Sequence, residues 1–195
     1  MDVWLISLEN GGEIVLSPDE ELRAARFHFE GDRARWIRAH SALRIILAKA
    51  TGIPAKEVRM AAGPHGKPSV VDGGGIEFSL SHSGSWGMVA VTRQVPVGVD
   101  IERIRENVNL TPLLKRLGEK DLPDTQIALY RRWTRREATS KAHGGALFDN
   151  PGADFRVYDL AAPEGYSASL ALIGIDPKVR RHHDFAAQGV PLQEF

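Results

Sequence analysis

Two carboxylates separated by one residue, Asp100 and Glu102, form the most chemically suggestive pair in the sequence. They end the run 97–102, in which residue types alternate as they do along a strand. Alternate strand residues share a face, so the two acids lie roughly 6–7 Å apart along the backbone. If their oxygens approach to about 4 Å, they repel by roughly 4 kcal/mol at an effective dielectric of about 20. The pair therefore indicates either a bound cation or shared proton, or that one acid faces water.

A third acid and a lysine follow on an expected helix from about residue 125 to 143. Glu137 and Lys141 are four residues apart and share a helical face with Trp133. Taken alone, they are typical of an ordinary surface ion pair worth a few tenths of a kcal/mol. Gly144 is expected to end the helix.

Polar residues also precede the acid pair. The run Ser81-His82-Ser83-Gly84 predicts a turn after a strand at 78–80, where a side chain or backbone N–H could meet an anion. Further upstream, the run 63–68 is not a Walker A loop, because proline follows Lys67. It predicts a rigid turn that presents one lysine.

The positioning elements can be placed from periodicity and capping residues. A strand is expected at 1–8, a helix from Pro18, and a second helix from about Asp32 that ends at Gly52. Two strands are expected at 155–158 and 166–173. The second helix also has a charged face, expected to be mostly solvated, that carries Arg33, Arg35, Arg38 and Arg44.

Composition excludes several classes of protein. The 195 residues are 43% hydrophobic and 26% charged with a formal charge of zero, which is typical of a globular protein and not of a nucleic-acid binder. The absence of cysteine excludes disulfides, thiolate zinc sites and cysteine nucleophiles. No apolar run has the length of a membrane span, and the first eight residues lack a signal pattern. We expect a cytoplasmic protein without a nucleic-acid or membrane partner.

Four motifs in order resemble those of the 4′-phosphopantetheinyl transferases of the Sfp-like type. They are Gly66-Lys67-Pro68, the run 78–83, the run 98–102, and the run 133–141. Each motif is weak alone, but their order and spacing together are specific, and the resemblance covers roughly residues 17 to 147.

The resemblance implies an α+β fold, a pseudo-twofold pair of similar subdomains, each a small antiparallel sheet packed with helices. The active site would lie in the cleft between residues 1–93, which contact coenzyme A, and residues 94–195, which supply the metal ligands and the catalytic helix. The implied protein is a pseudodimeric monomer.

The implied reaction is Mg²⁺-dependent transfer of the 4′-phosphopantetheine arm of coenzyme A to a serine of an apo acyl or peptidyl carrier protein, with release of adenosine 3′,5′-bisphosphate. The carrier could serve fatty-acid, polyketide or non-ribosomal peptide biosynthesis. Two alternatives stay open: a metal-dependent phosphohydrolase, and a non-catalytic protein that binds coenzyme A or a carrier.

The resemblance also assigns roles by position. Asp100, Glu102 and Glu137 correspond to the Mg²⁺ ligands, and oxygen ligands with a diphosphate substrate suit that ion. Glu137 and Lys141 are the expected catalytic residues. Glu137 would take the proton of the carrier serine, directly or through a metal-bound water, and Lys141 would contact the transferring phosphate and stabilise or protonate the leaving phosphate. Which of the two handles which proton stays open. The residues expected to bind coenzyme A are Arg35, Lys67, Ser81, His82 and Lys141.

The sequence departs from the family pattern at two places. Arg136 stands where the family often has lysine. The first helix begins Asp19-Glu20-Glu21 where family members tend to place basic residues that hold the 3′-phosphate, and Arg23 and Arg26 are the nearest cations. Recognition of that phosphate is therefore expected to be weak.

Basic residues in the middle of the chain indicate either a docking face for an acidic carrier or a solvated surface: Arg103, Arg105, Lys115, Arg116, Arg131, Arg132, Arg135 and Arg136.

Overall fold

The computed structural model describes residues 1–195 except 10, 64–65, 145–154, 175–179 and 183–195, and gives the backbone alone for 180–182. The helices are α1 (Pro18–Ala24), α2 (Glu30–Thr51), α3 (Thr111–Arg116) and α4 (Gln126–His143). The strands are β1 (Asp2–Ser7), β2 (Met60–Ala62), β3 (Pro68–Val70), β4 (Ile76–Ser83), β5 (Trp86–Arg93), β6 (Val97–Arg103), β7 (Phe155–Leu160), β8 (Tyr166–Ile173) and β9 (Arg180–His182). Within the described residues, no helix has both the length and the apolarity of a membrane span.

Two main sheets organise these elements. One has the strand order β4-β5-β1-β9 and the other the order β6-β8-β7, while β2 and β3 form a separate hairpin. The coarse prediction of an α+β fold with small antiparallel sheets is confirmed, with one difference. Strand β9 comes from the end of the chain and pairs with β1 in parallel.

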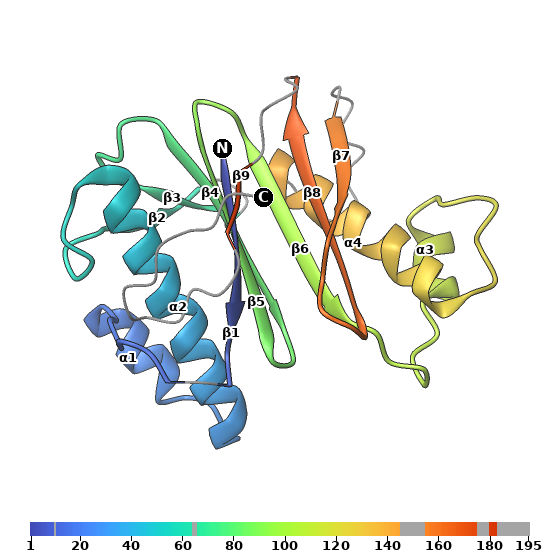
Figure 1. The fold of residues 1–195 in the computed structure, drawn as a ribbon, viewed down its shortest axis with the longest axis horizontal. Coiled ribbons are helices and arrows are strands. Elements are labelled where there is room, and N and C mark those ends of the chain that lie inside the picture. Colours follow the sequence, from blue (N-terminus) through green and yellow to red (C-terminus); the bar gives the residue numbers. More distant parts are fainter. Residues whose placement is uncertain (10, 64–65, 145–154, 175–179, 183–195) are drawn as a thin grey trace.

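Alternating burial gives each sheet two apolar faces. In β1, Ile6 packs toward α2, whereas Val3 and Leu5 pack toward β6 and β8. Small residues of α4 and β8 fill the opposite face of the second sheet. The order of layers is therefore α2, four-stranded sheet, three-stranded sheet and α4, as Figure 1 shows.

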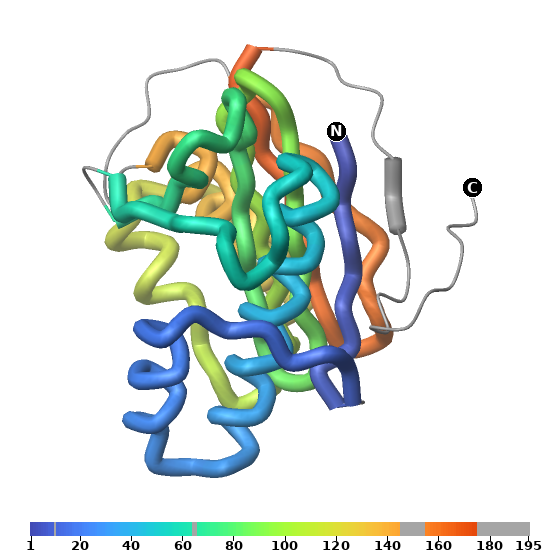
Figure 2. Tube along the Cα trace, turned by 90° about the vertical axis from the view of Figure 1, so that its left-hand side faces the viewer, coloured from blue at the N-terminus to red at the C-terminus, as the bar shows by residue number. Residues whose placement is uncertain are grey.

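Helix α1 begins as the sequence predicts. The Ser17 hydroxyl accepts from the Glu20 backbone N–H, and the Glu20 carboxylate accepts from the Ser17 N–H, which together form a capping box. Both views place α1 beside the first turns of α2 (Figures 1 and 2).

One arginine of α2 was misplaced by the sequence prediction. Arg44 is not on a solvated face but only 2% exposed. Its side chain donates to the Glu20 carboxylate and, through Nη1, to the backbone oxygens of Ala55 (2.9 Å) and Val58 (3.0 Å). Helical periodicity could not reveal these partners, because they come from outside α2. The buried guanidinium joins α1, α2 and the segment before β2.

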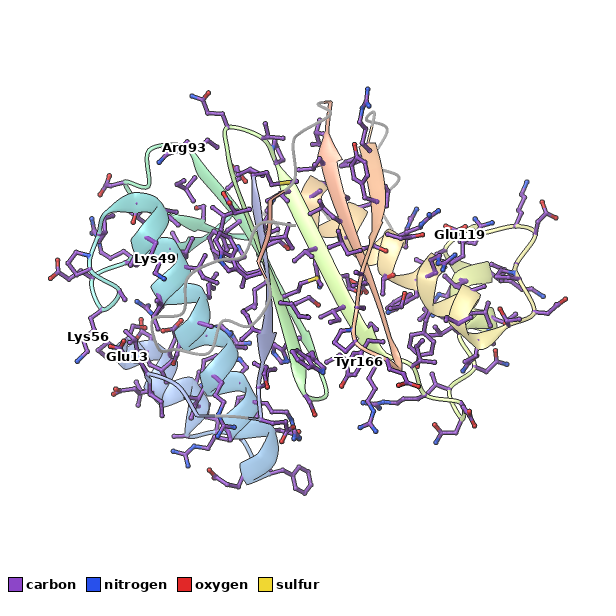
Figure 3. All side chains as sticks on the ribbon, in the orientation of Figure 1. Glu13, Lys49, Lys56, Arg93, Glu119 and Tyr166 are labelled. Carbon is purple, nitrogen blue, oxygen red and sulfur yellow. The ribbon has the colours of Figure 1, made fainter. Side chains whose placement is uncertain are left out.

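The segment at 81–84 also differs from its prediction. Strand β4 continues through Ser83, so Ser81 and His82 lie in the sheet, and only Gly84 and Ser85 form the turn to β5. Tyr166, labelled in Figure 3, accepts a hydrogen bond from the Ser85 N–H over 3.1 Å. A β8 side chain therefore holds the turn that follows the polar part of β4.

Helix α4 lies directly on β6. A Cβ added at Gly98 would overlap the Ala138 carbonyl and the Ala142 backbone nitrogen, so only glycine allows this approach. Buried hydroxyls then fix the helix on β8, where Thr134 Oγ1 lies 3.2 Å from Ser167 Oγ and 2.9 Å from Ser169 Oγ. This packing brings one face of α4 over the acidic end of β6.

Candidate active site

Asp100 is the buried centre of the site, with 1% of its surface exposed. Its Oδ1 atom accepts from the Lys141 ammonium over 2.7 Å and from the Ser81 hydroxyl over 2.7 Å. The Lys141 ammonium also lies 3.0 Å from Ser81 Oγ. Three residues that are far apart in sequence thus meet at one carboxylate oxygen.

The second oxygen of Asp100 has a different environment. Oδ2 is buried and has no hydrogen-bond partner among the described residues. A buried carboxylate oxygen without a partner is unfavourable, and such an atom calls for a ligand, an ion or a functional explanation.

Glu102 and Glu137 lie close enough to Asp100 to influence one another. Burial raises the pKa of Glu102, and the Asp100 charge adds to this, while hydrogen bonds from Ser83 and Trp133 and the Lys141 charge oppose it. Burial also raises the pKa of Glu137, with the Asp100 and Glu102 charges adding and Lys141 opposing. The three acids and Lys141 therefore form one electrostatic cluster, contributed by β6 and α4.

The donor chemistry of this cluster fits a hard divalent cation. Carboxylate oxygens are the ligands that Mg²⁺ takes, and a cation would satisfy Asp100 Oδ2 and relieve the repulsion that adds to the effect of burial on the pKa values of Glu102 and Glu137. In the part of the chain that the structure describes, no three His, Cys, Asp or Glu side chains already stand at metal-ligand spacing. Asp100 Oδ1 is instead neutralised by the Lys141 ammonium.

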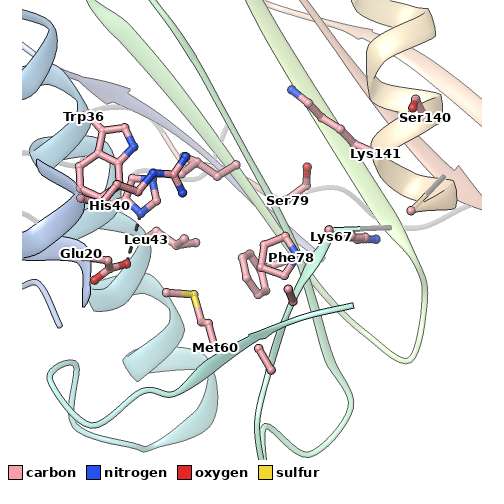
Figure 4. A pocket seen from close by; sticks show the side chains of 17 residues that line it. Glu20, Trp36, His40, Leu43, Met60, Lys67, Phe78, Ser79, Ser140 and Lys141 are labelled. Atoms are coloured by element: carbon pink, nitrogen blue, oxygen red, sulfur yellow. Dashed lines mark hydrogen bonds and ion pairs between the residues drawn. The ribbon is translucent and has the colours of Figure 1, made fainter. Parts of the chain in front are cut away.

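Lys141 connects the acid cluster to a cavity of about 540 Å³. The cavity is lined by both halves of the chain, from α1, α2 and the β2–β3 hairpin to α4. Figure 4 shows Trp36 and His40 side by side at one end, with Lys141 and Lys67 toward the other. The cavity is large enough to hold a substantial part of a small-molecule ligand.

Lys67 lines this cavity, but its ammonium has protein partners. It donates to the backbone oxygens of Val97 (3.2 Å) and Ala142 (3.3 Å), and it lies 3.6 Å from Glu77 Oε2. Burial lowers the pKa of Lys67, while the Glu77 charge opposes that shift. The contact with Ala142 places a positive charge at the carboxyl end of α4, where the helix dipole favours it.

The remaining predicted coenzyme contacts lie outside the cavity lining. Arg35 pairs with Asp32 (2.7 Å) and more distantly with Glu9 (3.8 Å). His82 has an exposed side chain; partial desolvation lowers its pKa, as do the nearby charges of His40, Lys141 and Arg35. The charges of Lys141 and Arg35 thus both act on the His82 ring.

Sequence reasoning missed the aromatic end of the cavity. The rings of Trp36 and His40 stack at 3.9 Å with an interplanar angle of 25°, and the Arg23 guanidinium lies 5.5 Å from the Trp36 ring. His40 Nδ1 lies 3.3 Å from Glu20 Oε1. Trp36 and His40 are four residues apart, so helical spacing could have indicated their contact but not the cavity beside them.

Two models of one family match consecutive parts of the chain. A family model described as 4′-phosphopantetheinyl transferase, N-terminal, matches residues 12–94, and the model of the 4′-phosphopantetheinyl transferase superfamily matches residues 96–188. The chain belongs to the 4′-phosphopantetheinyl transferase superfamily.

Several curated relatives carry that description. The chain is 34% identical over 144 residues to 4′-phosphopantetheinyl transferase HetI of Nostoc sp. strain PCC 7120, covering 68% of this chain and 61% of the relative. It is 35% identical over 131 residues to AcpT of Salmonella typhimurium, covering 63% and 65%. It is 26% identical over 141 residues to Sfp of Bacillus subtilis, covering 68% and 62%. The matches thus span a little under two thirds of each relative's length.

Proposed function

We propose that this chain transfers the 4′-phosphopantetheine arm of coenzyme A to a serine of an apo carrier protein and releases adenosine 3′,5′-bisphosphate. The observation that carries the proposal is Asp100, which shares one oxygen with Lys141 and Ser81 and leaves the other buried without a partner. Family membership and the adjoining cavity support it.

Glu137 and Lys141 are the proposed catalytic residues. Glu137 has a raised pKa because of burial and the Asp100 charge, which brings a carboxylate closer to the pKa that suits a general base near neutral pH. In the proposal it accepts the proton of the carrier serine. Lys141 lines the cavity, and in the proposal its ammonium stabilises the charge that develops on the phosphate as the bond to the adenosine part breaks.

Asp100, Glu102 and Glu137 are the proposed ligands of Mg²⁺. When bound, the ion would polarise the diphosphate and neutralise its charge. The Lys141 ammonium partly offsets the Asp100 charge, and Ser81 of β4 donates a hydrogen bond to the same Asp100 oxygen.

The cavity is the proposed binding site of coenzyme A. Lys67 and Lys141 supply positive charge at one end, and the stacked Trp36 and His40 rings line the other. Ser81, His82 and Arg35 are proposed to contact the phosphates, because Ser81 Oγ lies 3.0 Å from the Lys141 ammonium and the charges of Lys141 and Arg35 both act on His82. Lys67 would have to release a backbone oxygen to bind a phosphate directly.

The proposed architecture is a monomeric pseudodimer of residues 1–93 and 94–195 with the active site between them. Strands β1–β5 fall in the first half and β6–β8 in the second, and the cavity takes residues from both. Strand β9 crosses this division by pairing with β1. Expressing the two halves separately tests the division: each should fold only when the other is present, because their sheets share a core.

The assay supplies coenzyme A, Mg²⁺ and an apo carrier protein, and measures the intact mass of the carrier. Transfer adds one phosphopantetheine arm per carrier serine. The rival phosphohydrolase would release nucleotide without any carrier and leave the carrier mass unchanged. A non-catalytic binding protein would release no nucleotide and would leave the carrier mass unchanged. The Glu137→Ala variant provides the inactive control. Glu137→Gln retaining full turnover would exclude the base role.

Carrier docking on the basic middle of the chain is a second part of the proposal. Arg131 and Arg135 both contact Asp159, at 3.4 Å and 2.7 Å, and Arg132 contacts Glu119 at 3.1 Å. These partners reduce the net positive charge of α4, and an acidic carrier would compete with them. Charge reversal at Arg131 and Arg132 should weaken carrier binding and flatten its salt dependence. Unchanged affinity and salt dependence would count against docking on this face.

A further inference from the structure

A row of serines joins the two main sheets. Strands β4 and β6 are edge strands of different sheets, yet they lie against each other. Ser79, Ser81 and Ser83 occupy alternate positions of β4 and therefore face the same side. Each of the three hydroxyls bonds to β6.

The serine row supplies hydrogen bonds that the backbone of a neighbouring strand would otherwise supply. An edge strand presents unpaired backbone N–H groups that need partners when they are buried. Ser79 Oγ accepts from the Val99 N–H over 3.1 Å, and Ser83 Oγ accepts from the Arg103 N–H over 3.1 Å. The side chains of β4 thus satisfy two backbone N–H groups on the open edge of β6, and Asp100 and Glu102 lie between these two positions in the strand.

Ser83 has a bond that edge satisfaction does not require. Besides accepting from Arg103, its hydroxyl donates to Glu102 Oε2 over 2.7 Å. A hydroxyl has one hydrogen, and here the backbone N–H directs that hydrogen toward the carboxylate. One oxygen of Glu102 is therefore fixed in direction from the neighbouring sheet.

We infer that Ser83 is a positioning residue that orients the Glu102 carboxylate for divalent-cation binding, an inference that rests on the proposed function. Ligating carboxylates are commonly held by such outer hydrogen bonds, and removing one typically weakens metal affinity or activity by about 10–100-fold. Ser81 makes the equivalent bond to Asp100 from two residues earlier in β4. The spacing of the serines matches the spacing of the two acids.

The purely structural alternative is that Ser83 serves only the Arg103 N–H. This alternative predicts that loss of the Ser83 hydroxyl changes the free energy of unfolding and does not change the affinity for the cation. Ser85 provides a matched control, because its hydroxyl donates to Glu9 Oε1 over 2.7 Å on the exposed side of the adjacent turn. Ser85→Ala removes a serine–glutamate hydrogen bond of the same length away from the acid cluster.

The experiment measures Mn²⁺ binding, as a probe for Mg²⁺, by electron paramagnetic resonance of the whole chain with coenzyme A and without carrier. Ser83→Ala should weaken Mn²⁺ binding by about 10–100-fold. Ser83→Thr keeps the hydroxyl and should restore binding, and Ser85→Ala should match the wild type. Ser83→Cys keeps the size but offers only a weak donor, so it should fall between alanine and threonine and covers a failure of the alanine variant to fold.

Wild-type Mn²⁺ affinity in Ser83→Ala or Ser83→Cys, together with normal transfer by the wild type, would overturn the positioning role and leave the proposed function standing. Equal loss of binding in Ser83→Thr and Ser83→Ala would also overturn it, because the hydroxyl would then be irrelevant. If the wild type neither binds Mn²⁺ nor modifies a carrier, the proposed function itself fails and the inference fails with it.

Discussion

The Lys141 ammonium lies 2.7 Å from Asp100 Oδ1, and this ion pair joins α4 to β6 across the candidate site. The Asp100 side chain is 2% exposed and the Lys141 side chain 32%. An isolated buried carboxylate would be strongly unfavourable, so Lys141 has a structural role besides its proposed catalytic one.

A double-mutant cycle measures this pair. Lys141→Met leaves Asp100 buried without its cation and should lower the free energy of unfolding by about 2–3 kcal/mol, less than for a fully buried pair because Lys141 is partly solvated. Asp100→Asn removes the charge that needs compensation, so the double variant should lose less than the sum of the single variants. Urea unfolding provides the four values. The exposed Lys56→Met is the control, and strictly additive losses at Asp100 and Lys141 would refute the coupling.

Gly98 should tolerate no side chain. Gly98→Ala places a Cβ against the backbone of Ala138 and Ala142, so α4 must shift away from β6. We expect a loss of about 2–3 kcal/mol in unfolding free energy, in the range for overpacked interiors. Gly11→Ala, which adds a Cβ in open space, should be nearly neutral. Wild-type stability of Gly98→Ala would contradict the close approach described above.

Glu20 predicts a pH dependence of stability. Burial alone would raise its pKa, but hydrogen bonds from His40, the Ser17 backbone and Arg44, with the Arg44 charge, lower the pKa of Glu20 from 4.5 to about 2. Because the folded pKa is below the unfolded one, the stabilisation is complete above pH 4.5 and is lost as the pH falls toward 2. Glu20→Gln should therefore lose about 3 kcal/mol near pH 7.

The difference between Glu20→Gln and the wild type should shrink as the pH falls through that window. Denaturant unfolding at several pH values checks it, with the exposed neighbour Glu21→Gln as control. A difference that is independent of pH would mean that the carboxylate charge of Glu20 is not what stabilises α1 on α2.

The same residues predict weak recognition of the coenzyme's 3′-phosphate. The aromatic end of the cavity carries the Arg23 guanidinium but also the Glu20 carboxylate, and α1 opens with Asp19 and Glu21 nearby. A phosphate there would meet opposing charges, so dephospho-coenzyme A should compete with coenzyme A almost equally in the transfer assay. Much weaker competition by dephospho-coenzyme A would show that this end of the cavity recognises the phosphate after all.

Local patterns predicted the elements that carry the site. The capping residues placed the start of α1, the glycines placed the ends of α2 and α4, and strand alternation placed Asp100 and Glu102 on β6. These features depend on residues within a few positions of one another, which is why they could be predicted from the sequence.

Contacts between distant segments could not be predicted in this way. Arg44 was expected on a solvated face because helical spacing says nothing about Glu20 or the backbone at 55–58. The serine row of β4 repeats every two residues, as do the acids of β6, and that shared period was a usable signal. Lys67 was expected to present its charge to a ligand, whereas its contacts with Val97 and Ala142 depend on how the two halves pack.

The most direct test of the account is the intact mass of an apo carrier protein after incubation with coenzyme A, Mg²⁺ and this chain. The account predicts a gain of one phosphopantetheine arm, which is lost when a chelator replaces Mg²⁺ and in the Asp100→Ala variant. An unchanged carrier mass across a panel of fatty-acid, polyketide and peptide carriers, or an equal gain with Asp100→Ala, would contradict it.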